Sequence, residues 1–154
     1  TSSVKDPFIA ACLLGKINRS KEMKIQLEID EESNLAQIPG SFNTKMFVTV
    51  LGNIIDNAME AASKAKGELG YVKVSFTDFG SEIIFDIEDN GNGVPEEYHV
   101  KIFEEGFTTK VGENHGLGLS IVKNTIELMQ GQIYLSTSDS GGARFTIVIP
   151  KKRV

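Results

Sequence analysis

The sequence contains no tryptophan, four prolines and a single cysteine among its 154 residues. With only Cys12, the chain cannot form a disulfide between two of its own residues, which suits a reducing compartment. Its apolar runs are far shorter than the roughly 20 residues that a membrane-spanning helix needs. No signal peptide is visible, and because the chain starts at "TSSVKDP" without Met, we expect an excised or processed fragment.

An excess of positive charge is also missing. The chain carries 16 basic and 21 acidic residues, and the resulting net charge of −5, with no basic stripe, argues against a nucleic-acid partner. A hydrophobic content of 40% and a charged content of 24% are ordinary for a soluble globular protein. This length is enough for one domain with a buried core. Composition therefore predicts a soluble domain and gives no function.

Apolar residues at helical spacing predict three long helices, over about residues 7–21, 43–64 and 116–130. The first would start at Asp6, whose carboxylate can cap the helix ahead of a proline in the first turn. The third would end at Gly131 in the left-handed conformation. The residues of the first helix that we expect to point inward are Phe8, Ile9, Cys12, Leu13 and Ile17.

Alternating apolar residues predict strands. One strand lies within residues 23–30, a hairpin within 71–89 turns at Gly80, and a second hairpin within 132–150 turns at "SDSGG". A short helix follows Pro95, ahead of a loop rich in Gly, Thr and Glu. The order helix, strand, helix, hairpin, helix, hairpin predicts an α/β protein with helices on one face of a mostly antiparallel sheet.

Three polar residues, Asn53, Asn57 and Glu60, interrupt the apolar pattern of the second helix. On a wheel of 100° per residue they fall within about 60° of one another, at the edge of the apolar face. One interpretation is a solvated stripe, and the other is a polar wall beside a cleft. Amide oxygens are hard, neutral ligands, so the second interpretation suits Mg²⁺, which usually takes one or two protein oxygens.

The stretch "IEDNGNGVP" places Asp89 at the end of a predicted strand, followed by Gly91 and Gly93. A tight turn that needs positive φ is one interpretation. A calcium loop is disfavoured, because His99 stands where the bidentate Glu should be. A third interpretation is a carboxylate that accepts a hydrogen bond from a purine amino group, with glycines that let the ring approach.

A phosphate site could lie in "GENHGLGLSIV", where Gly116 and Gly118 lead into a helix whose free N–H groups attract anions. This stretch is neither a Walker A loop, since no Gly-Lys-Ser/Thr follows, nor the dinucleotide fingerprint, which would need glycine at Ile121. Residues 102–116 have the composition of a mobile lid. We expect Phe103 and Phe107 to anchor it.

Together these motifs resemble the catalytic ATP-binding domain of bacterial sensor histidine kinases, within the class shared with gyrase, Hsp90 and MutL. The resemblance follows the family's order: "NIIDNAME" (53–60) is similar to the N box and "DNGNG" (89–93) to the first glycine box. "IFEEGFTTK" (102–110) resembles the F box, and "HGLGL" (115–119) the second glycine box. "GGARFTIVIP" (141–150) is similar to the closing strand. The fold implied is the two-layer α/β sandwich of Bergerat type.

The resemblance covers roughly residues 24–150. The opening "DPFIAACLLGKINRSKEM" further resembles the linker helix of citrate and C4-dicarboxylate sensor kinases. We therefore expect residues 1–22 to be a linker helix from an upstream dimerisation region, and residues 23–154 to be the ATP-binding catalytic domain.

The resemblance implies ATP and Mg²⁺ as cofactors and assigns roles. Asp89 would bind the adenine amino group, Asn57 would coordinate Mg²⁺ with Asn53 beside it, and Lys110 is a candidate for the γ-phosphate. Gly91 and Gly93 would admit the adenine, and the glycines of the second box would face the phosphates. The implied catalytic residues are Asn53, Asn57 and Lys110. The implied nucleotide-binding set is Asn53, Asn57, Glu60, Asp89, Gly91, Gly93, Phe103, Phe107, Thr108, Lys110, His115, Gly116, Leu117, Gly118 and Leu119.

Asn53 distinguishes between activities. ATP-hydrolysing relatives and the related serine kinases have a glutamate base at the matching position, since water or a serine hydroxyl must lose a proton. An asparagine amide cannot accept that proton, whereas a neutral imidazole can attack without a strong base. The resemblance therefore favours phosphoryl transfer to histidine, by positioning and electrostatics, over hydrolysis of the gyrase type. The sequence departs from the family pattern at three positions. Glu60 stands where many relatives have Lys or Arg, Asn114 stands where the second glycine box would have a glycine two before Gly116, and Ala143 stands where relatives often have Thr.

The acceptor histidine is not expected in this chain. His99 is predicted to be solvated, His115 abuts the second glycine box, and neither lies in a long amphipathic helix. The resemblance implies an acceptor on a dimerisation domain upstream in the same receptor, and a cognate response regulator as partner. It further implies a cytoplasmic domain of a membrane-anchored bacterial receptor, monomeric when isolated and homodimeric at full length. A non-catalytic ATP-sensing module with a nucleotide-ordered lid is the alternative.

Overall fold

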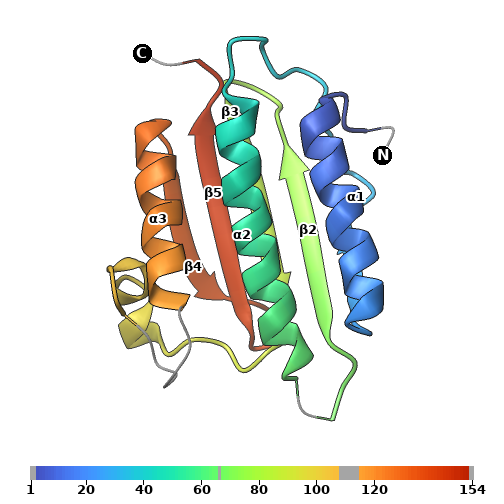
Figure 1. Cartoon of the computed structure of the whole chain (residues 1–154), viewed down its shortest axis with the longest axis vertical. Coiled ribbons are helices and arrows are strands. Elements are labelled where there is room, and N and C mark those ends of the chain that lie inside the picture. Colours follow the sequence, from blue (N-terminus) through green and yellow to red (C-terminus); the bar gives the residue numbers. More distant parts are fainter. Residues whose placement is uncertain (1–2, 66, 108–114, 153–154) are drawn as a thin grey trace.

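A computed structural model describes residues 3–65, 67–107 and 115–152. In this part of the chain, three helices cover one face of a five-stranded sheet (Figure 1). The helices are α1 (Pro7–Glu22), α2 (Thr44–Ser63) and α3 (His115–Leu128), with short 3₁₀ turns η1 (Glu96–Tyr98) and η2 (Lys101–Phe103). The strands are β1 (Gln26–Ile29), β2 (Tyr71–Thr77), β3 (Glu82–Asp89), β4 (Gln132–Thr137) and β5 (Ala143–Pro150). None of the described helices is long and apolar enough to cross a membrane.

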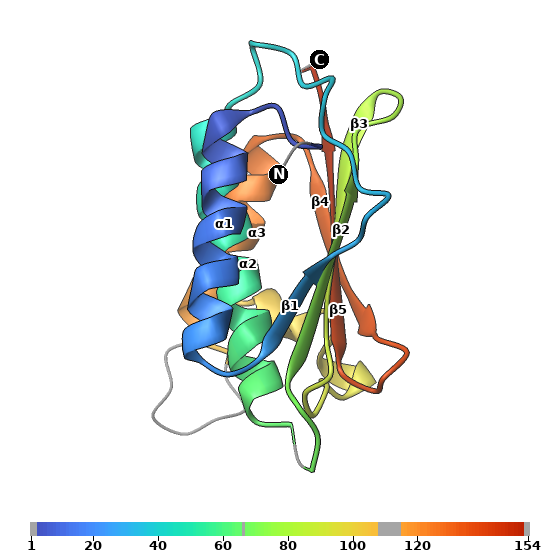
Figure 2. The ribbon, with the colours of Figure 1, turned by 90° about the vertical axis from the view of Figure 1, so that its right-hand side faces the viewer.

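The sheet has the order β1-β2-β3-β5-β4, with β1 parallel to β2 and every other pair antiparallel. Figure 2 shows the helices in one layer and the sheet in the other, with the opposite face of the sheet uncovered. Alternation along β3 and β5 explains this, because every second side chain is buried under the helices. The predicted α/β sandwich is confirmed.

Helix α2 lies over the middle of the sheet. Phe47 from α2 packs against Phe85 on β3 with ring centroids 5.1 Å apart, and Phe76 on β2 stacks on Phe85 at 4.9 Å. The apolar side of the helix is completely buried, including Leu51 and Ile54. Burial of such side chains contributes about 1.5–3 kcal/mol each, so the position of α2 is strongly fixed. The polar residues on its other side are held equally firmly.

Helix α1 starts where the sequence predicts. Asp6 caps it, with Oδ1 accepting from the backbone N–H of Phe8 at 2.9 Å and of Ile9 at 3.1 Å. Ile9 and Leu13 are fully buried, as expected, so α1 is part of the core. The expectation for Phe8 is wrong: it is 53% exposed, because it lies outside the strip that meets α2, and Lys45 approaches its ring instead. Whether residues 1–22 continue an upstream helix stays a prediction.

The end of α3 differs from the prediction by one residue. Gln130, not Gly131, adopts the left-handed conformation, with φ of 62°. The N–H of Gly131 reaches the carbonyl of Ile126 and that of Gln130 reaches Glu127, both at 2.9 Å, which is the Schellman pattern. Gly131 has a different reason to be glycine, because a Cβ there would lie 2.5 Å from the carbonyl oxygen of Val148.

Candidate functional site

Four segments far apart in the sequence meet at one end of the molecule, the lower end in Figure 1. They are the C-terminal half of α2, the end of β3, the turn between β4 and β5, and the start of α3. The antiparallel order produces this meeting, because β3 ends where β4 ends and β5 begins. The sheet therefore places the end of β3 next to the β4–β5 turn.

The polar stripe of α2 lies along its outer ridge. Asn53 is exposed, while Asn57 and Glu60 are half-buried. Glu60 Oε1 lies 3.7 Å from Lys64 Nζ, one turn further along the helix. At 100° per residue, Asn57 lies on the flank of α2 that also carries Ala61, the residue against which the loop after β3 packs. Of the predicted stripe, Asn57 is thus the member on the same flank of α2 as Ala61.

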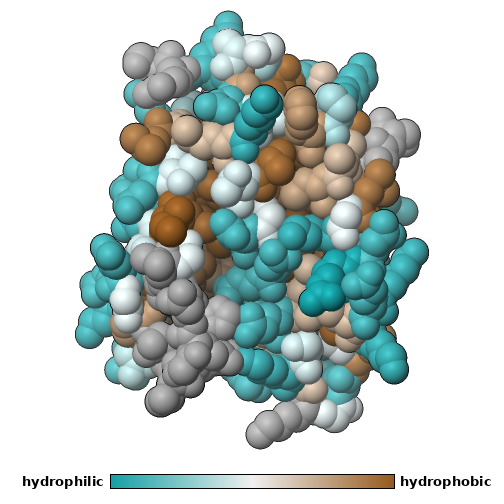
Figure 3. All heavy atoms as spheres, in the orientation of Figure 1, coloured by the Kyte–Doolittle hydropathy of each residue, from teal (hydrophilic) through white to brown (hydrophobic). Residues whose placement is uncertain are grey.

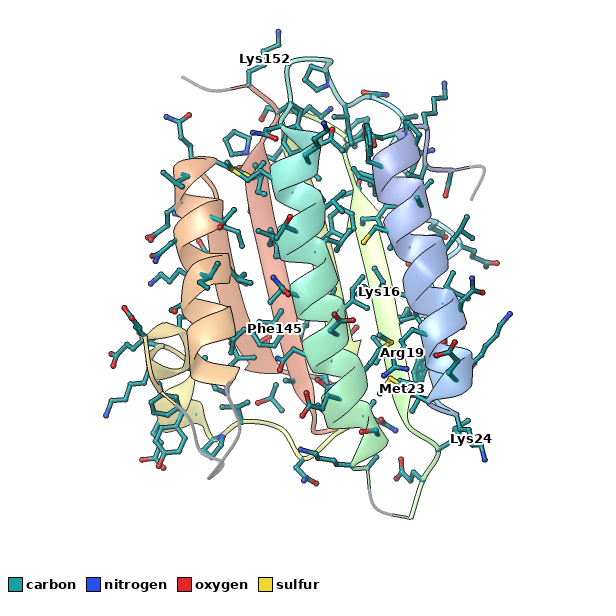
Figure 4. The ribbon with its side chains drawn as sticks, in the orientation of Figure 1. Lys16, Arg19, Met23, Lys24, Phe145 and Lys152 are labelled. Atoms are coloured by element: carbon teal, nitrogen blue, oxygen red, sulfur yellow. The ribbon has the colours of Figure 1, made fainter. Side chains whose placement is uncertain are left out.

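A groove of about 920 Å³ runs between α1 and α2, and Asn53 and Glu60 line it from α2. Lys16, Arg19 and Met23 project from α1 toward α2 on the other side (Figure 4). Lys16 Nζ donates to Asp56 Oδ1 at 2.7 Å across the two helices. Figure 3 shows a hydrophilic band over this part of the surface. Neither Asn57 nor Asp89 lines this groove.

Asp89 is the last residue of β3 and only 3% exposed. Its Oδ1 accepts from the backbone N–H of Gly91 at 2.8 Å and of Ala143 at 3.3 Å. Among the described residues, no group donates to Oδ2. Burial raises the pKa of this carboxyl, and the two N–H donors partly offset that rise. A buried carboxylate with one oxygen left over can accept a hydrogen bond from an amino group.

The two glycines after Asp89 allow close packing. A Cβ on Gly91 would lie 2.6 Å from the carbonyl oxygen of Ala61 on α2. Gly93 has φ of +76°, and a Cβ there would lie 2.5 Å from the carbonyl oxygen of Gly141. The tight-turn interpretation is therefore satisfied as well, since the loop is wedged between α2 and the β4–β5 turn. Contact of these glycines with adenine stays a prediction.

The calcium-loop interpretation gains no support. Across the described residues, no group of three His, Cys, Asp or Glu side chains is arranged to hold a metal ion. His99, at the position of the missing ligand, is half-buried and its Nε2 lies 2.8 Å from the carbonyl oxygen of Val94. The prediction that His99 is solvated is thus wrong, because this hydrogen bond ties its ring to the loop.

The first turn of α3 contains the glycines of the predicted anion site. Gly118 is half-buried, and no described atom lies within 4 Å of where its Cβ would be. Leu119, in contrast, is 5% exposed and belongs to the core with Val122. The helix backbone includes Gly116. The structure describes neither Thr108 and Lys110 nor the side chains of His115 and Leu117, so the predictions for these four residues lie outside what the structure describes.

Two phenylalanines hold the segment before α3. Phe103 is 6% exposed and packs edge-on against Phe145 of β5, with centroids 6.1 Å apart. Figure 4 places Phe145 on the helix side of the sheet, between α3 and α2. Phe107 lies beside Tyr98, with centroids 5.4 Å apart. Phe103 therefore anchors this segment in the core, whereas Phe107 packs within the segment itself.

Two residues beside Asp89, Ser138 and Ser140, are not predicted by any sequence motif. Both hydroxyls donate to the carbonyl oxygen of Asp89, at 2.9 Å and 3.2 Å respectively. Ser138 is buried although it stands in a polar turn sequence. In the sequence, these two serines belong to a serine-rich turn, and such a turn looks the same whether it is exposed to solvent or buried.

Comparisons with known proteins agree with this geometry. The family model described as histidine kinase-, DNA gyrase B-, and HSP90-like ATPase matches residues 43–153. The sensor protein CitS of Halalkalibacterium halodurans is 40% identical over 148 residues, which are 96% of this chain and 28% of that protein. The chain thus spans less than a third of the length of the curated relatives it matches.

Solved structures give the same result. The nucleotide-free catalytic domain of histidine kinase ThkA superposes with a TM-score of 0.76 at 29% identity, covering 95% of this chain and 93% of that one. The histidine kinase ThkA in complex with the response regulator protein TrrA gives a TM-score of 0.74 at 27% identity, covering 97% of this chain and 41% of that one.

Proposed function

This chain belongs to the family of histidine kinase-, DNA gyrase B- and HSP90-like ATPases, and we propose that it is the ATP-binding catalytic domain of a sensor histidine kinase. It would transfer the γ-phosphoryl group of ATP to a histidine on a separate dimerisation domain. Its relatives suggest the citrate and C4-dicarboxylate group of these kinases. The observation that carries this proposal is Asp89, a buried carboxylate with one oxygen left to receive the adenine amino group.

Mg²⁺ fits the residues on α2. Asn57 offers a half-buried amide oxygen on the flank nearest the Asp89 loop, with Asn53 one turn before it. One or two such oxygens are what Mg²⁺ usually takes from a protein, the rest of its ligands being water and phosphate. When bound, the ion would neutralise charge on the phosphates. Glu60 already has a neighbouring cation in Lys64, so we expect it to affect phosphate binding less than its charge suggests.

Asn53 explains the choice of acceptor. Its amide cannot take a proton from water or from a serine hydroxyl, so no general base stands at that position of α2. A neutral imidazole already carries a lone pair and needs only to be positioned. Gly116 and Gly118 at the start of α3 would leave backbone N–H groups open to the phosphates. Lys110 is our candidate for the γ-phosphate, by charge and position in the sequence.

The partners follow from this role. The acceptor histidine would be supplied by the dimerisation domain of the same receptor, which we expect to be a membrane-anchored homodimer. A response regulator would then take the phosphoryl group. The ThkA–TrrA complex supports such a partner, since its kinase shares this fold over 97% of the present chain.

The first experiment is a calorimetric titration with a non-hydrolysable ATP analogue, with and without Mg²⁺. We expect affinity that rises with Mg²⁺ in the wild type and in the control Asn124→Ala, an exposed asparagine on α3. Asn57→Ala should bind the analogue without that dependence. An Asn57→Ala variant whose affinity still rises with Mg²⁺ would refute the magnesium assignment, and no binding by the wild type would refute the site.

The second experiment tests transfer. The domain is mixed with the separate histidine-bearing domain of its receptor and ATP labelled at the γ-phosphate. Label on that histidine is the expected result. Binding without transfer would favour the ATP-sensing module, and steady phosphate release by the domain alone would favour a hydrolase.

A further inference from the structure

The carbonyl group of Asp89 lies just past the end of a strand ladder. The register of β3 with β5 stops at the pair Glu88 and Arg144, so β5 gives Asp89 no regular strand partner. Asp89 is nevertheless buried, and a buried carbonyl without a donor destabilises the folded state. The β4–β5 turn supplies donors: Ser138 Oγ at 2.9 Å and Ser140 Oγ at 3.2 Å, with the two hydroxyl oxygens 3.0 Å apart.

The same turn also contacts the side chain of Asp89. The N–H of Ala143 donates to Oδ1 at 3.3 Å. Gly142 is pressed so closely on this residue that a Cβ would lie 2.1 Å from the carbonyl oxygen and 2.7 Å from Oδ1 of Asp89. The turn is closed on itself, since Ser138 N–H reaches the carbonyl of Gly142 and Gly141 N–H reaches that of Ser138, both at 2.9 Å. One closed turn therefore holds both the backbone and the carboxylate.

Holding Oδ1 determines where Oδ2 points. A hydrogen bond to a ligand amino group needs a donor–acceptor distance of about 2.7–3.2 Å and weakens steeply when the angle is poor. A carboxylate free to rotate would lose that geometry part of the time. It would also discriminate less between an amino group, which donates, and an oxo group, which accepts.

We propose that Ser138, assisted by Ser140, is a positioning residue that orients Asp89 to recognise an amino-bearing purine. This inference rests on the proposed ATP-binding function and assigns to the β4–β5 turn a share in base specificity. Ser138 does not touch the base: it fixes the Asp89 backbone, and through it the direction of the free carboxylate oxygen.

A purely structural serine would behave differently. If Ser138 only satisfied a buried carbonyl, its loss would lower the free energy of unfolding and leave the relative affinity for different bases unchanged. The informative readout is therefore the ratio of affinities for two triphosphates that differ only at position 6 of the purine. Adenosine triphosphate has an amino group there, and inosine triphosphate has an oxo group.

The test is a titration of the wild type, Ser138→Ala, Ser140→Ala and Asp89→Asn with non-hydrolysable analogues of both triphosphates, in Mg²⁺. We expect Ser138→Ala to reduce the preference for the adenine compound about five- to tenfold, as for the loss of one hydrogen bond to the positioning network. Ser140→Ala, whose bond is longer and more exposed, should reduce it about two- to threefold. Ser136→Ala, an exposed serine on the same strand, is the matched control and should keep the wild-type ratio.

Thermal unfolding of each variant is followed in parallel. If Ser138→Ala does not fold, the affinity ratio of the variant at the exposed Ser140, Ser140→Ala, tests the inference instead. A wild type without preference for adenine, or an Asp89→Asn variant that keeps it, would overturn the proposed function and this inference together. If Asp89→Asn loses the preference while folded serine variants retain the wild-type ratio, only this inference is overturned.

Discussion

The tips of the two hairpin turns lie in opposite surroundings, although Asp78 at the base of the β2–β3 turn is only 3% exposed. In the β2–β3 turn, Phe79 is 87% exposed and nothing described lies within 4 Å of where a Cβ on Gly80 would be. In the β4–β5 turn, Ser138 is 6% exposed and a Cβ on Gly142 would lie 2.1 Å from a backbone oxygen. The tip of the β2–β3 turn lies in solvent, and the β4–β5 turn packs against Asp89.

The strand order causes this difference. Because β3 lies next to β5, the end of β3 meets the turn that precedes β5, while the β2–β3 turn projects from the opposite end of the sheet. The amino-acid composition of a turn indicates that the chain reverses direction there. Which residues the turn contacts depends on the register of the strands. A polar turn is therefore a candidate part of a binding site only when the strand register places it next to other residues of that site.

The largest contrast should come from inserting two residues, Gly-Ser, into each turn. After Gly141, the insertion would separate Ser138 and Ala143 from Asp89, so we expect lost ATP-analogue binding and a clearly lower unfolding temperature. After Gly80, the same insertion should leave binding unchanged, because exposed turn tips tolerate added residues. Calorimetry and thermal unfolding measure both effects. If both insertions lowered analogue binding and the unfolding temperature equally, the proposed difference between the two turns would be wrong.

Replacing one glycine in each turn by alanine should give a smaller contrast. Gly142→Ala should lower the free energy of unfolding by about 3 kcal/mol, since the added Cβ overlaps packed backbone atoms. Gly80→Ala should cost about 1–2 kcal/mol, from its φ of +91° alone. Urea unfolding measures the two values. A Gly142→Ala variant as stable as Gly80→Ala would mean that the residues packed around Asp89 can rearrange to accommodate the added Cβ.

The charge of Asp89 should make the buried turn sensitive to pH. Burial raises the pKa of this carboxyl, so the folded state holds the proton more tightly than the unfolded chain. This contribution to stability is present below the ordinary aspartate pKa of 3.8, and it is lost as the pH rises through the raised value. Asp89→Asn should therefore be more stable than the wild type at neutral pH, with a difference that shrinks in acid. Urea midpoints across this range would contradict the prediction if the difference stayed constant.

The smallest effect belongs to the exposed turn. Phe79→Ser should change the free energy of unfolding by less than about 0.5 kcal/mol, because the ring has almost no buried surface to lose. ATP-analogue binding should also be unchanged. A larger loss measured by urea unfolding would show that this turn is packed in solution.

Much of the fold follows from local patterns in the sequence. The cap at Asp6, the alternation along β3 and the apolar face of α2 each depend on residues within one element, and the structure confirms all three. The resemblance also brought Asn57, Asp89 and the start of α3 into one site before any geometry was available. The structure packs the loop after Asp89 against α2, and joint contact of these segments with a nucleotide stays a prediction.

The missed features depend on contacts between distant segments. Ser138 lies 49 residues from Asp89, so its hydrogen bond could be found only from the register of β3 and β5. Phe8 has the spacing of an inward residue, yet α1 meets α2 along a strip too narrow to cover it. Gln130 takes the left-handed position because the last turn of α3 closes one residue early, leaving Gly131 to meet β5.

The central pairing of β3 with β5 has a consequence for folding kinetics. Each hairpin joins neighbouring segments, whereas β3 and β5 join residues such as Asp86 and Arg144, 58 positions apart. Non-local pairing of this kind closes a long loop and is slow. Asp89 is on one hairpin and the turn that holds it is on the other, so the proposed purine site can form only after the two hairpins have joined. We therefore expect bound nucleotide to slow unfolding while leaving the folding rate almost unchanged.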